Sequence, residues 1–517
     1  MRREDIALRD AARQGHSRAC LAMAGKLFCG NDGLARNYRL GLAYLQQELN
    51  RQSPAARLLA AEAVPVDILA AHQLLDVLPP AAEAGSRVAM LKLGIWRMLT
   101  NRQHGDGLCL VRRSQRCSMA LTDDAAREPL TLVQLLRTLT PAEAEPGELA
   151  LAAAAVAIAA QDLAQACLCL QVAMAFMPPG PRLAQPVLAC VRMASASDGE
   201  LLLPVELVEH SLRLLCDLGD ADAQLALGCA LAGASHGRLM PYRMVHSIDP
   251  ERAAALLLRA GDAGRSEAWL TLAIMVPGFR SALTHQGMAR YFLEKAARAG
   301  LAPAQLRLGA VLLKEAVSME SAEPGLHWLH SAAQQGSVQA LELLNTLVLP
   351  LPDLPASFQS VVIAKATALD RETGERLALA RALHLTRHEA LHFNARRDLR
   401  PWGIVIPGNA KENPRGRLAP VTSAAMKATL AQAAAFFGQA SPMDGALGLQ
   451  RSRMLRQVLL SLSLTEAQLF APAIGRSWSH PGYGRHWAAR TGDLLARILH
   501  EQGNKSALTQ PELLTAA

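Results

Sequence analysis

Residues 288–313, "MARYFLEKAARAGLAPAQLRLGAVLL", join two Ala- and Leu-rich segments through a single glycine, Gly300. Gly264 and Gly336 lie 36 residues before and after Gly300. An alanine follows each of these glycines by four residues, and a leucine follows each alanine by four more. The two columns contain Ala268, Ala304 and Ala340, then Leu272, Leu308 and Leu344. Self-similarity at one fixed period is typical of repeat architectures.

The same columns recur toward the N-terminus. Gly219, Ala223 and Leu227 lie 45 residues before Gly264 and the alanine and leucine that follow it, and the loop "GASHGRLMPY" accounts for the longer interval. Further copies are predicted at Gly15, Ala19 and Met23, and at Gly85, Ala89 and Leu93, with a degenerate copy between them at Ala55 and Leu59. Repeats are therefore expected near the N-terminus as well as at the centre of the chain.

A second set of columns precedes each glycine and has the spacing of an amphipathic helix. Its positions are Ala253, Ala289 and Gly325, then Leu257, Leu293 and Leu329, then Ala260, Ala296 and Ala332. Each repeat is therefore predicted to be a pair of helices. A glycine just beyond an Ala-rich helix favours a left-handed terminating residue, a conformation that glycine adopts without steric cost.

Small side chains predict how these helices pack. The alanines, with Gly228 and Gly309, let paired helices approach closely, and the leucines fill the space between pairs. One pair alone could not bury its apolar face, so neighbouring pairs must stack. The sequence therefore predicts an all-α, right-handed α-solenoid of helix-turn-helix repeat pairs, followed by a mostly helical C-terminal region.

Three segments resemble Sel-one-like repeats, bacterial relatives of tetratricopeptide repeats: "LGDADAQLALGCALAG", "MARYFLEKAARAGLAPAQLRLGAVLL" and "GLHWLHSAAQQGSVQALELL". The pattern is interrupted at Asn345, which replaces a glycine of the helix that follows the turn. The resemblance implies an adaptor whose concave face binds other proteins, in a family without catalytic residues to carry over. It divides the chain into degenerate Sel-one-like repeats at 1–130, a tetratricopeptide-like segment at 131–215 and Sel-one-like repeats at 216–350.

Composition agrees with a helical protein. Of the 517 residues 51% are hydrophobic and only 4% aromatic, and the hydrophobic share is mostly Ala and Leu, which favour helices. The formal net charge of +8 would assist binding to acidic surfaces without requiring a nucleic-acid partner. Nine cysteines without a C-x-x-C pair favour reduced thiols and a cytoplasmic location.

The sequence shows neither a secretory signal nor a membrane span. The N-terminal "MRREDIALRDAARQG" is charged throughout, and the longest apolar run, 149–160, is too short to cross a bilayer. Phosphate-binding glycine loops and the G-x-S-x-G nucleophile motif are also absent, so no cofactor is predicted.

A separate C-terminal region, 351–517, is predicted because three prolines interrupt helix in "LVLPLPDLPASF". Within it His388, Glu389 and His392 match the H-E-x-x-H pattern, in which two histidines hold zinc and the glutamate activates water. Glu412 would be the third ligand, and His384 lies one turn earlier. A zinc metallopeptidase is therefore one hypothesis, although residues 356–383 have a helical pattern where such enzymes have a sheet.

A second interpretation of this region is a winged helix at 356–421. The segment 376–396 resembles a helix-turn-helix, with His384 at the turn and Thr386 opening the second helix through a capping box with Glu389. Strands are predicted at 402–406 and 417–421. The residues that would contact nucleic acid are Arg387, His388, His392 and Arg396 on the second helix and Lys411, Arg415 and Arg417 on the wing.

A third interpretation is that residues 351–517 cap the solenoid or dock proteins, since terminal repeats need a polar outer face. Over the whole chain, the sequence favours a non-enzymatic, cytoplasmic scaffold that binds other proteins on the concave face of its repeats. A nucleic-acid-binding regulator acting through 376–421 and a zinc peptidase acting through 388–392 stay open as alternatives.

Overall fold

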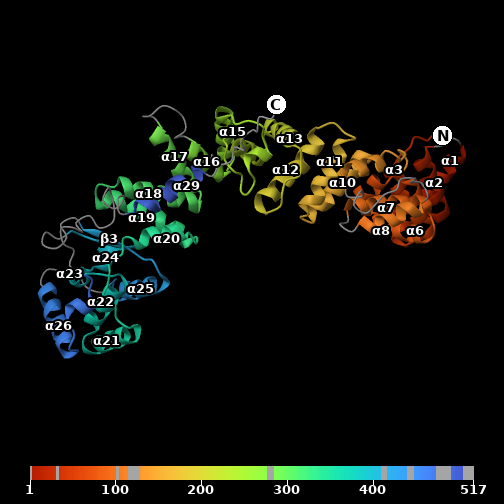
Figure 1. Ribbon diagram of the computed structural model, residues 1–517. Coiled ribbons are helices and arrows are strands. Elements are labelled where there is room, and N and C mark those ends of the chain that lie inside the picture. Colours follow the sequence, from red (N-terminus) through yellow and green to blue (C-terminus); the bar gives the residue numbers. More distant parts are fainter. Residues whose placement is uncertain are drawn as a thin grey trace. The chain divides into compact units, whose positions relative to one another are not determined.

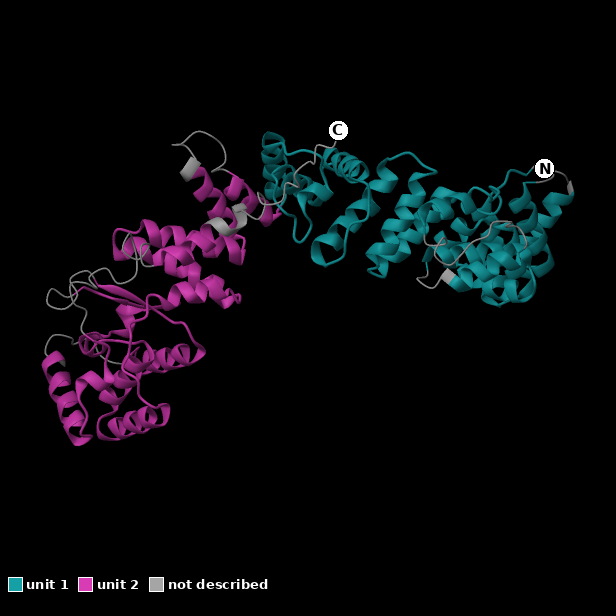
Figure 2. Cartoon of the chain, viewed as in Figure 1, with its two compact units in different colours: residues 1–263 teal, residues 264–517 magenta. Residues whose placement is uncertain are grey.

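The computed structural model describes residues 3–30, 34–100, 104–114, 128–275, 285–408, 416–438, 447–472 and 491–504. The chain divides into two compact units, residues 1–263 and residues 264–517 (Figure 2). Both units are built almost entirely of α-helices (Figure 1), so the predicted all-α class is confirmed. None of the described helices is both long enough and apolar enough to cross a membrane.

Unit 1 is a succession of short helices in which neighbours along the chain pack as pairs. The closest pairs are α2 with α3, α7 with α8, α10 with α11, α12 with α13, and α14 with α15. The bounds are α1 (Arg3–Arg13), α2 (Ser17–Cys29), α3 (Tyr38–Asn50), α4 (Pro54–Ala63), α5 (Val66–Ala71), η1 (Leu75–Val77), α6 (Leu78–Glu83), α7 (Arg87–Thr100), α8 (His104–Arg113), α9 (Pro129–Leu136), α10 (Pro146–Ala159), α11 (Leu163–Met174), α12 (Pro181–Ala196), α13 (Val205–Asp217), α14 (Ala221–Leu231), η3 (Pro241–Arg243) and α15 (Pro250–Asp262).

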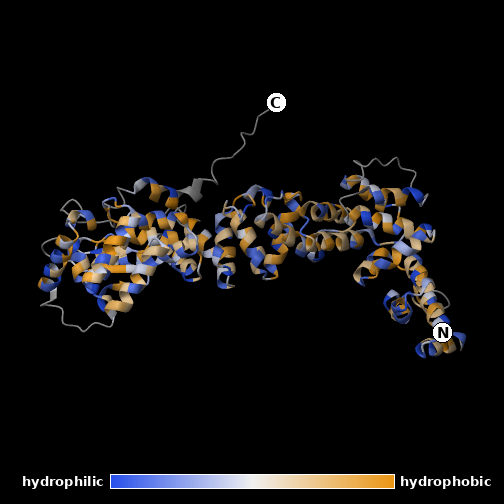
Figure 3. Cartoon of the chain, turned by 90° about the horizontal axis from the view of Figure 1, so that it is seen from below, coloured by the Kyte–Doolittle hydropathy of each residue, from blue (hydrophilic) through white to orange (hydrophobic). Residues whose placement is uncertain are grey.

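Unit 2 begins with two further pairs, α16 with α17 and α18 with α19, and one more repeat helix, α20. Their bounds are α16 (Ser266–Met275), α17 (His285–Arg298), α18 (Ala302–Glu315), α19 (Met319–Gln334) and α20 (Val338–Asn345). Hydrophobic and hydrophilic stretches alternate along most of the helices (Figure 3), as expected for helices that bury one side against a neighbour.

A residue with positive φ lies at every predicted glycine turn. The φ angles are 84° at Gly15, 92° at Gly85, 85° at Gly219, 94° at Gly264, 91° at Gly300 and 89° at Gly336. After Gly300 the amide of Leu301 donates to the carbonyl of Ala296 over 3.2 Å, which is the hydrogen bond of a Schellman turn. A Cβ built at Gly300 would meet no described atom within 4 Å, so the backbone angle and not a lack of space favours glycine.

The degenerate N-terminal copy is shifted by one residue from its predicted register. The positive φ, 56°, is at Gln52, and the buried alanines that follow are Ala56 and Ala60. The predicted position Ala55 is exposed, so the prediction of Ala55 and Leu59 is wrong by one residue. A glutamine with the same conformation, Gln161 with φ 57°, separates α10 from α11. This left-handed turn lies within the pair of α10 and α11, whereas the glycine turns from Gly219 onward lie between successive pairs.

Glycines set the distance between paired helices. A Cβ at Gly309 in α18 would lie 2.9 Å from the carbonyl oxygen of Gly325 in α19, and a Cβ at Gly228 would lie 2.8 Å from a leucine side chain of α15. Contacts this short exclude a larger residue without a shift of the helices, so the predicted role of Gly228 and Gly309 is confirmed. Gly94, which has the same place after Gly85 as Gly228 has after Gly219, makes an equivalent approach to Gly107 between α7 and α8; only Gly107 was not identified from the sequence.

The repeats end at α20. Asn345, which interrupts the glycine pattern, is the last residue of α20 and is exposed. No second helix of a further pair follows, since the next helix, α21 (Ala356–Leu369), belongs to a different hydrophobic core. A close helix approach is therefore not needed at position 345, and glycine is not required there.

Residues 351–472 form a small domain with its own core. Its further elements are α22 (Arg371–Ala382), α23 (Arg387–His392), α24 (Ala395–Asp398), β1 (Leu399–Arg400), β2 (Gly403–Ile406), β3 (Arg417–Pro420), α25 (Ala424–Gly438), α26 (Leu447–Ser461) and α27 (Glu466–Leu469), and α29 (Gly492–Asn504) follows. The strands form an antiparallel sheet in the order β1-β2-β3, with Ile406 paired to Arg417. The two predicted strands are confirmed.

The turn glycine can be tested against a matched glycine in the same repeat. Gly300→Ala is expected to lower the free energy of unfolding by about 1 kcal/mol, because an L-residue is strained at positive φ. Gly287→Ala, in the exposed part of α17 where a Cβ meets no described atom, is expected to leave stability unchanged or raise it, since alanine favours helix. Urea unfolding followed by circular dichroism measures both. Equal effects would contradict the assigned role of Gly300.

Candidate functional site

The first helices of successive pairs contact one another from α2 to α12 in unit 1. We call α2, α4, α7, α10, α12 and α14 the first helices of this unit, and α16, α18 and α20 those of unit 2. Along unit 1, α2 contacts α4, α4 contacts α7, α7 contacts α10, and α10 contacts α12. Second helices such as α13 and α15 make no comparable contact in the described part of the chain. The first helices of unit 1 therefore form one stacked row from α2 to α12, which includes α10 and α12 of the Ala-rich segment.

A buried lysine in α7 forms hydrogen bonds with the end of α4, the neighbouring first helix. Lys92 in α7 is 2% exposed, and its Nζ donates to the carbonyls of Ala61, Glu62 and Val64 at the end of α4, over 2.7 to 2.9 Å. Three acceptors satisfy all three ammonium donors. Burial lowers the pKa of Lys92 to about 8, partly offset by the attraction of Glu143. The ammonium therefore stays charged at pH 7 and holds α4 against α7.

The predicted repeat positions shape this row without offering side chains to a partner. The alanines are fully buried, at 0% exposure, and the turn glycines are exposed: Ala223, Ala268, Ala304 and Ala340, and Gly219, Gly264, Gly300 and Gly336. Each first helix is flanked by its own second helix and by a neighbouring pair. Leu58 in α4 and Val156 in α10 are large apolar residues exposed on this row.

The long loop before α15 covers α14. All nine residues of Ala223–Leu231 are buried, and η3 of the loop contacts the helix. A Cβ at Gly237 would lie 2.3 Å from the carbonyl oxygen of Ser195, so the loop passes directly over the end of α12. Arg238 and Arg243 add ion pairs with the acidic side chains of Asp198 and Glu200. The loop appeared in the sequence only as an insertion, and its packing rests on the buried side chains of Leu239, Met244 and Val245.

Both carboxylate oxygens of Glu389 in the HEALH segment are already engaged. Oε1 accepts from Arg417 Nε and Oε2 from Arg417 Nη2, each over 2.8 Å, and Oε2 also accepts from the amide of Thr386 over 2.9 Å. Thr386 Oγ1 accepts from the Glu389 amide, which completes the predicted capping box. Glu389 is therefore a structural residue, and its position opposes the role of water activation that a zinc peptidase requires.

The two histidines of the segment stack on each other. The ring centroids of His388 and His392 are 3.9 Å apart, and His392 Nδ1 donates to the His388 carbonyl. The third candidate ligand, Glu412, lies outside the described residues. Within the described residues, no group of three or more His, Cys, Asp or Glu side chains is placed to hold a metal ion.

Among the described residues, the candidate nucleic-acid contacts do not form one exposed basic surface. Arg417 is fully buried, so its prediction as a wing residue that touches phosphate is wrong: its charge is needed to pair with Glu389. Arg387, predicted to face outward, is half-buried, with Glu466 3.2 Å away and Ser452 accepting from Nη2. Arg396 is exposed. Lys411 and Arg415 lie outside the described residues.

The helix and the hairpin of the predicted winged helix pack against other parts of the chain. His384 has φ 52° and forms the turn that the sequence predicted, but the helix after it, α23, has only six residues. The hairpin places Trp402 and Leu418 in one hydrophobic cluster with leucines of α18, α19 and α20. β3 contacts α19, so the hairpin closes the end of the repeats and is not free to act as a wing.

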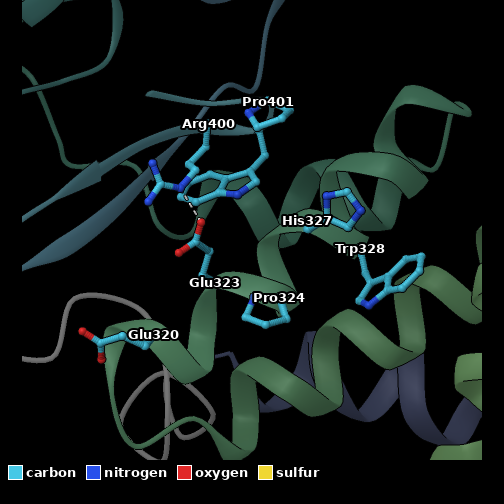
Figure 4. Close-up of a pocket in the computed structure, with 8 residues that line it drawn as sticks. Glu320, Glu323, Pro324, His327, Trp328, Arg400 and Pro401 are labelled. Atoms are coloured by element: carbon cyan, nitrogen blue, oxygen red, sulfur yellow. Dashed lines mark hydrogen bonds and ion pairs between the residues drawn. The ribbon is translucent and has the colours of Figure 1, made fainter. Parts of the chain in front are cut away.

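A shallow pocket of about 490 Å³ lies where this hairpin meets α19 (Figure 4). Arg400 crosses it and pairs with Glu323, with Nε 2.6 Å from Oε1. The remaining lining residues are Glu320, Pro324, His327, Trp328, Pro401 and Trp402. The opposite charges of Arg400 and Glu323 already pair with each other. The pocket therefore resembles a packing contact between the repeats and the C-terminal domain more than a ligand site.

The buried pair of Glu389 and Arg417 is expected to be essential for the C-terminal domain. Arg417→Met leaves an uncompensated buried carboxylate and should lower the free energy of unfolding by about 3 to 5 kcal/mol. Arg396→Met, an exposed control, should change it by less than about 0.5 kcal/mol. Thermal unfolding followed by circular dichroism measures both.

The double variant E389Q/R417M tests the physical cause. It removes the carboxylate charge but keeps an amide oxygen for the Thr386 cap, so it should be more stable than R417M alone. A double variant as unstable as R417M would show that lost packing, and not the buried charge, explains the effect.

Comparison with known proteins finds similarity among solved structures only. No protein-family model and no curated protein matches the chain. A Sel1 repeat protein from Oxalobacter formigenes is 20% identical, with 66% of this chain and 90% of that chain covered and a TM-score of 0.25. A protective antigen of uropathogenic Escherichia coli with an SLR fold is 14% identical, with 95% and 97% covered and a TM-score of 0.27. On its own helix pairs and left-handed turns, this chain is an α-helical repeat protein.

Proposed function

We propose that the chain is a protein-interaction scaffold that binds partner proteins on the inner face formed by its first helices. The observation that carries this proposal is the continuous contact of first helices from α2 to α12. Such a row offers adjacent helices to one partner, so affinity comes from several helices instead of one pocket. The exposed apolar residues Leu58 and Val156 lie on this row, where they can be buried by a partner.

Two further observations support a scaffold in place of an enzyme. The best acid–base candidate, Glu389, is occupied by Arg417 and by the Thr386 amide. The pocket at α19 is crossed by an ion pair and contains no residue positioned by a base or nucleophile partner. We also assign the protein to the cytoplasm, because the eight described cysteines are free thiols and six of them are buried.

Photo-crosslinking distinguishes the inner face from the outer face. A photoreactive amino acid is placed at Leu58 or Val156 on first helices, which are 39% and 46% exposed, and at Leu40 or Leu258 on second helices, which are 45% and 40% exposed. The four positions are matched in exposure and hydrophobicity. Illumination in the native host is expected to give covalent protein adducts at Leu58 and Val156 but not at the other two positions. Adducts of equal yield on both faces would sink the proposal.

Substitution at the same positions gives a second, independent measurement. L58D/V156D is expected to reduce recovery of the crosslinked partner at least ten-fold in affinity capture, because a charged residue on a buried contact is strongly unfavourable. L40D/L258D should leave recovery unchanged. Both double variants change exposed side chains, so circular dichroism should show the helicity of the wild-type chain. Unchanged recovery with L58D/V156D would contradict binding at this face.

A further inference from the structure

The last described helix, α29, packs on the repeats and not on the domain that precedes it. The core of residues 351–472 is formed by side chains of α21 to α27, and none of its described members comes from α29. Leu495 and Ile498 of α29 are instead buried in the cluster that contains Leu306, Leu313 and Leu329 of the repeats. Figure 1 shows α29 beside α18. This helix therefore covers a surface of the repeats, although it follows the C-terminal domain in the sequence.

One face of α29 makes this contact. Leu495 and Ile498 are 4% and 3% exposed, and Leu494 and Leu499 are half-buried against the same cluster. Asp493, Ala496 and Arg497 on the other side are exposed. The apolar positions follow the spacing i, i+1, i+4 and i+5, which places them on one side of a helix. Helices with this pattern bind in grooves between other helices.

The helix that α29 covers is a first helix. α18 is the element with which α29 makes its main contact in the described part of the chain, and α18 also contacts α20, the next first helix. α18 is buried at consecutive positions from Ala304 to Leu306 and again from Leu308 to Ala310, and it keeps exposure mainly along the stripe of Pro303, Arg307, Val311 and Lys314. In unit 2, α29 thus occupies the kind of surface to which the proposed function assigns partners.

The attachment of α29 is small compared with that of a repeat helix. Among the residues of α29 whose burial is described, two apolar side chains, Leu495 and Ile498, are buried in the repeats, whereas α19 buries five residues against its neighbours. A helix held by few buried contacts opens at lower free energy than the helices of the core. A competing helix with similar apolar positions can therefore take its place without unfolding the repeats.

We propose that the surface of α18 is a binding site for an amphipathic helix, that α29 fills it in the free chain, and that a partner displaces α29 with a helix of the same Leu/Ile pattern. This inference rests on the proposed scaffold function and adds the place, the partner's chemistry and a competition within the chain. The site is in unit 2, so the crosslinking positions of unit 1 test the scaffold function independently of it.

The experiment uses the full chain and a fluorescent peptide of residues 491–504. In the variant L495D/I498D, α29 can no longer bury its apolar face, so the α18 surface is open. Fluorescence anisotropy is expected to show that the peptide binds this variant at least ten-fold more tightly than the wild-type chain. The matched variant A496D/R497D, altered on the exposed face, should bind the peptide as weakly as wild type. A peptide that itself carries L495D/I498D should bind neither chain.

The opposite results overturn the proposal. A folded L495D/I498D chain that does not bind the peptide, or a wild-type chain that binds it equally well, excludes the competition. A wild-type dimer that this double substitution abolishes would identify a second copy, and not a foreign helix, as the occupant. If the variant does not fold, hydrogen exchange of the wild-type chain provides the test. Excess peptide should accelerate amide exchange in residues 491–504 of the chain at least ten-fold. Unchanged exchange refutes displacement.

Discussion

The architecture depends on one backbone constraint: the glycine that joins one helix pair to the next adopts a left-handed conformation. That conformation ends one helix, turns the chain within a few residues and presents the next helix with its alanine at the fourth position already against the core. The repeats keep one geometry because the same turn recurs with φ between 84° and 94° at six glycines. Close helix approach at Gly228 and Gly309 is useful only because the turn first sets the helices in register.

The sequence predicts the repeats correctly where the left-handed turn is occupied by glycine. The prediction fails where another residue occupies the turn. Gly264, Gly300 and Gly336 are visible because an L-residue is strained at their φ angles. Gln52 and Gln161 also have positive φ, but they are not glycines. A glutamine in the sequence does not indicate a left-handed turn. The N-terminal register was therefore misplaced by one residue, and the pairing of α10 with α11 could only be suspected from the Ala-rich composition.

The HEALH segment shows the limit of local patterns at a candidate site. The capping box of Thr386 and Glu389 was predictable because both residues lie within one helical turn. The partner of Glu389 was not, since Arg417 is 28 positions away and sits beside a loop whose charges suggested a surface. A buried carboxylate is stable only beside an opposite charge, and Arg417 supplies that charge to Glu389. A sequence pattern does not show which arginine will do so, and Arg417 is therefore buried where the sequence predicted an exposed residue.

The chain covers part of its own inner face, and this determines where a partner can bind. α14 is sealed by the loop that precedes α15, and α18 is covered by α29. The first helices α4 and α10 keep exposed apolar side chains instead. The loop over α14 packs directly on the backbone at Ser195, where a Cβ at Gly237 would meet the carbonyl oxygen. The terminal helix is anchored by two buried side chains among those described, Leu495 and Ile498. We therefore expect a competitor to open the α18 surface more easily than the α14 surface.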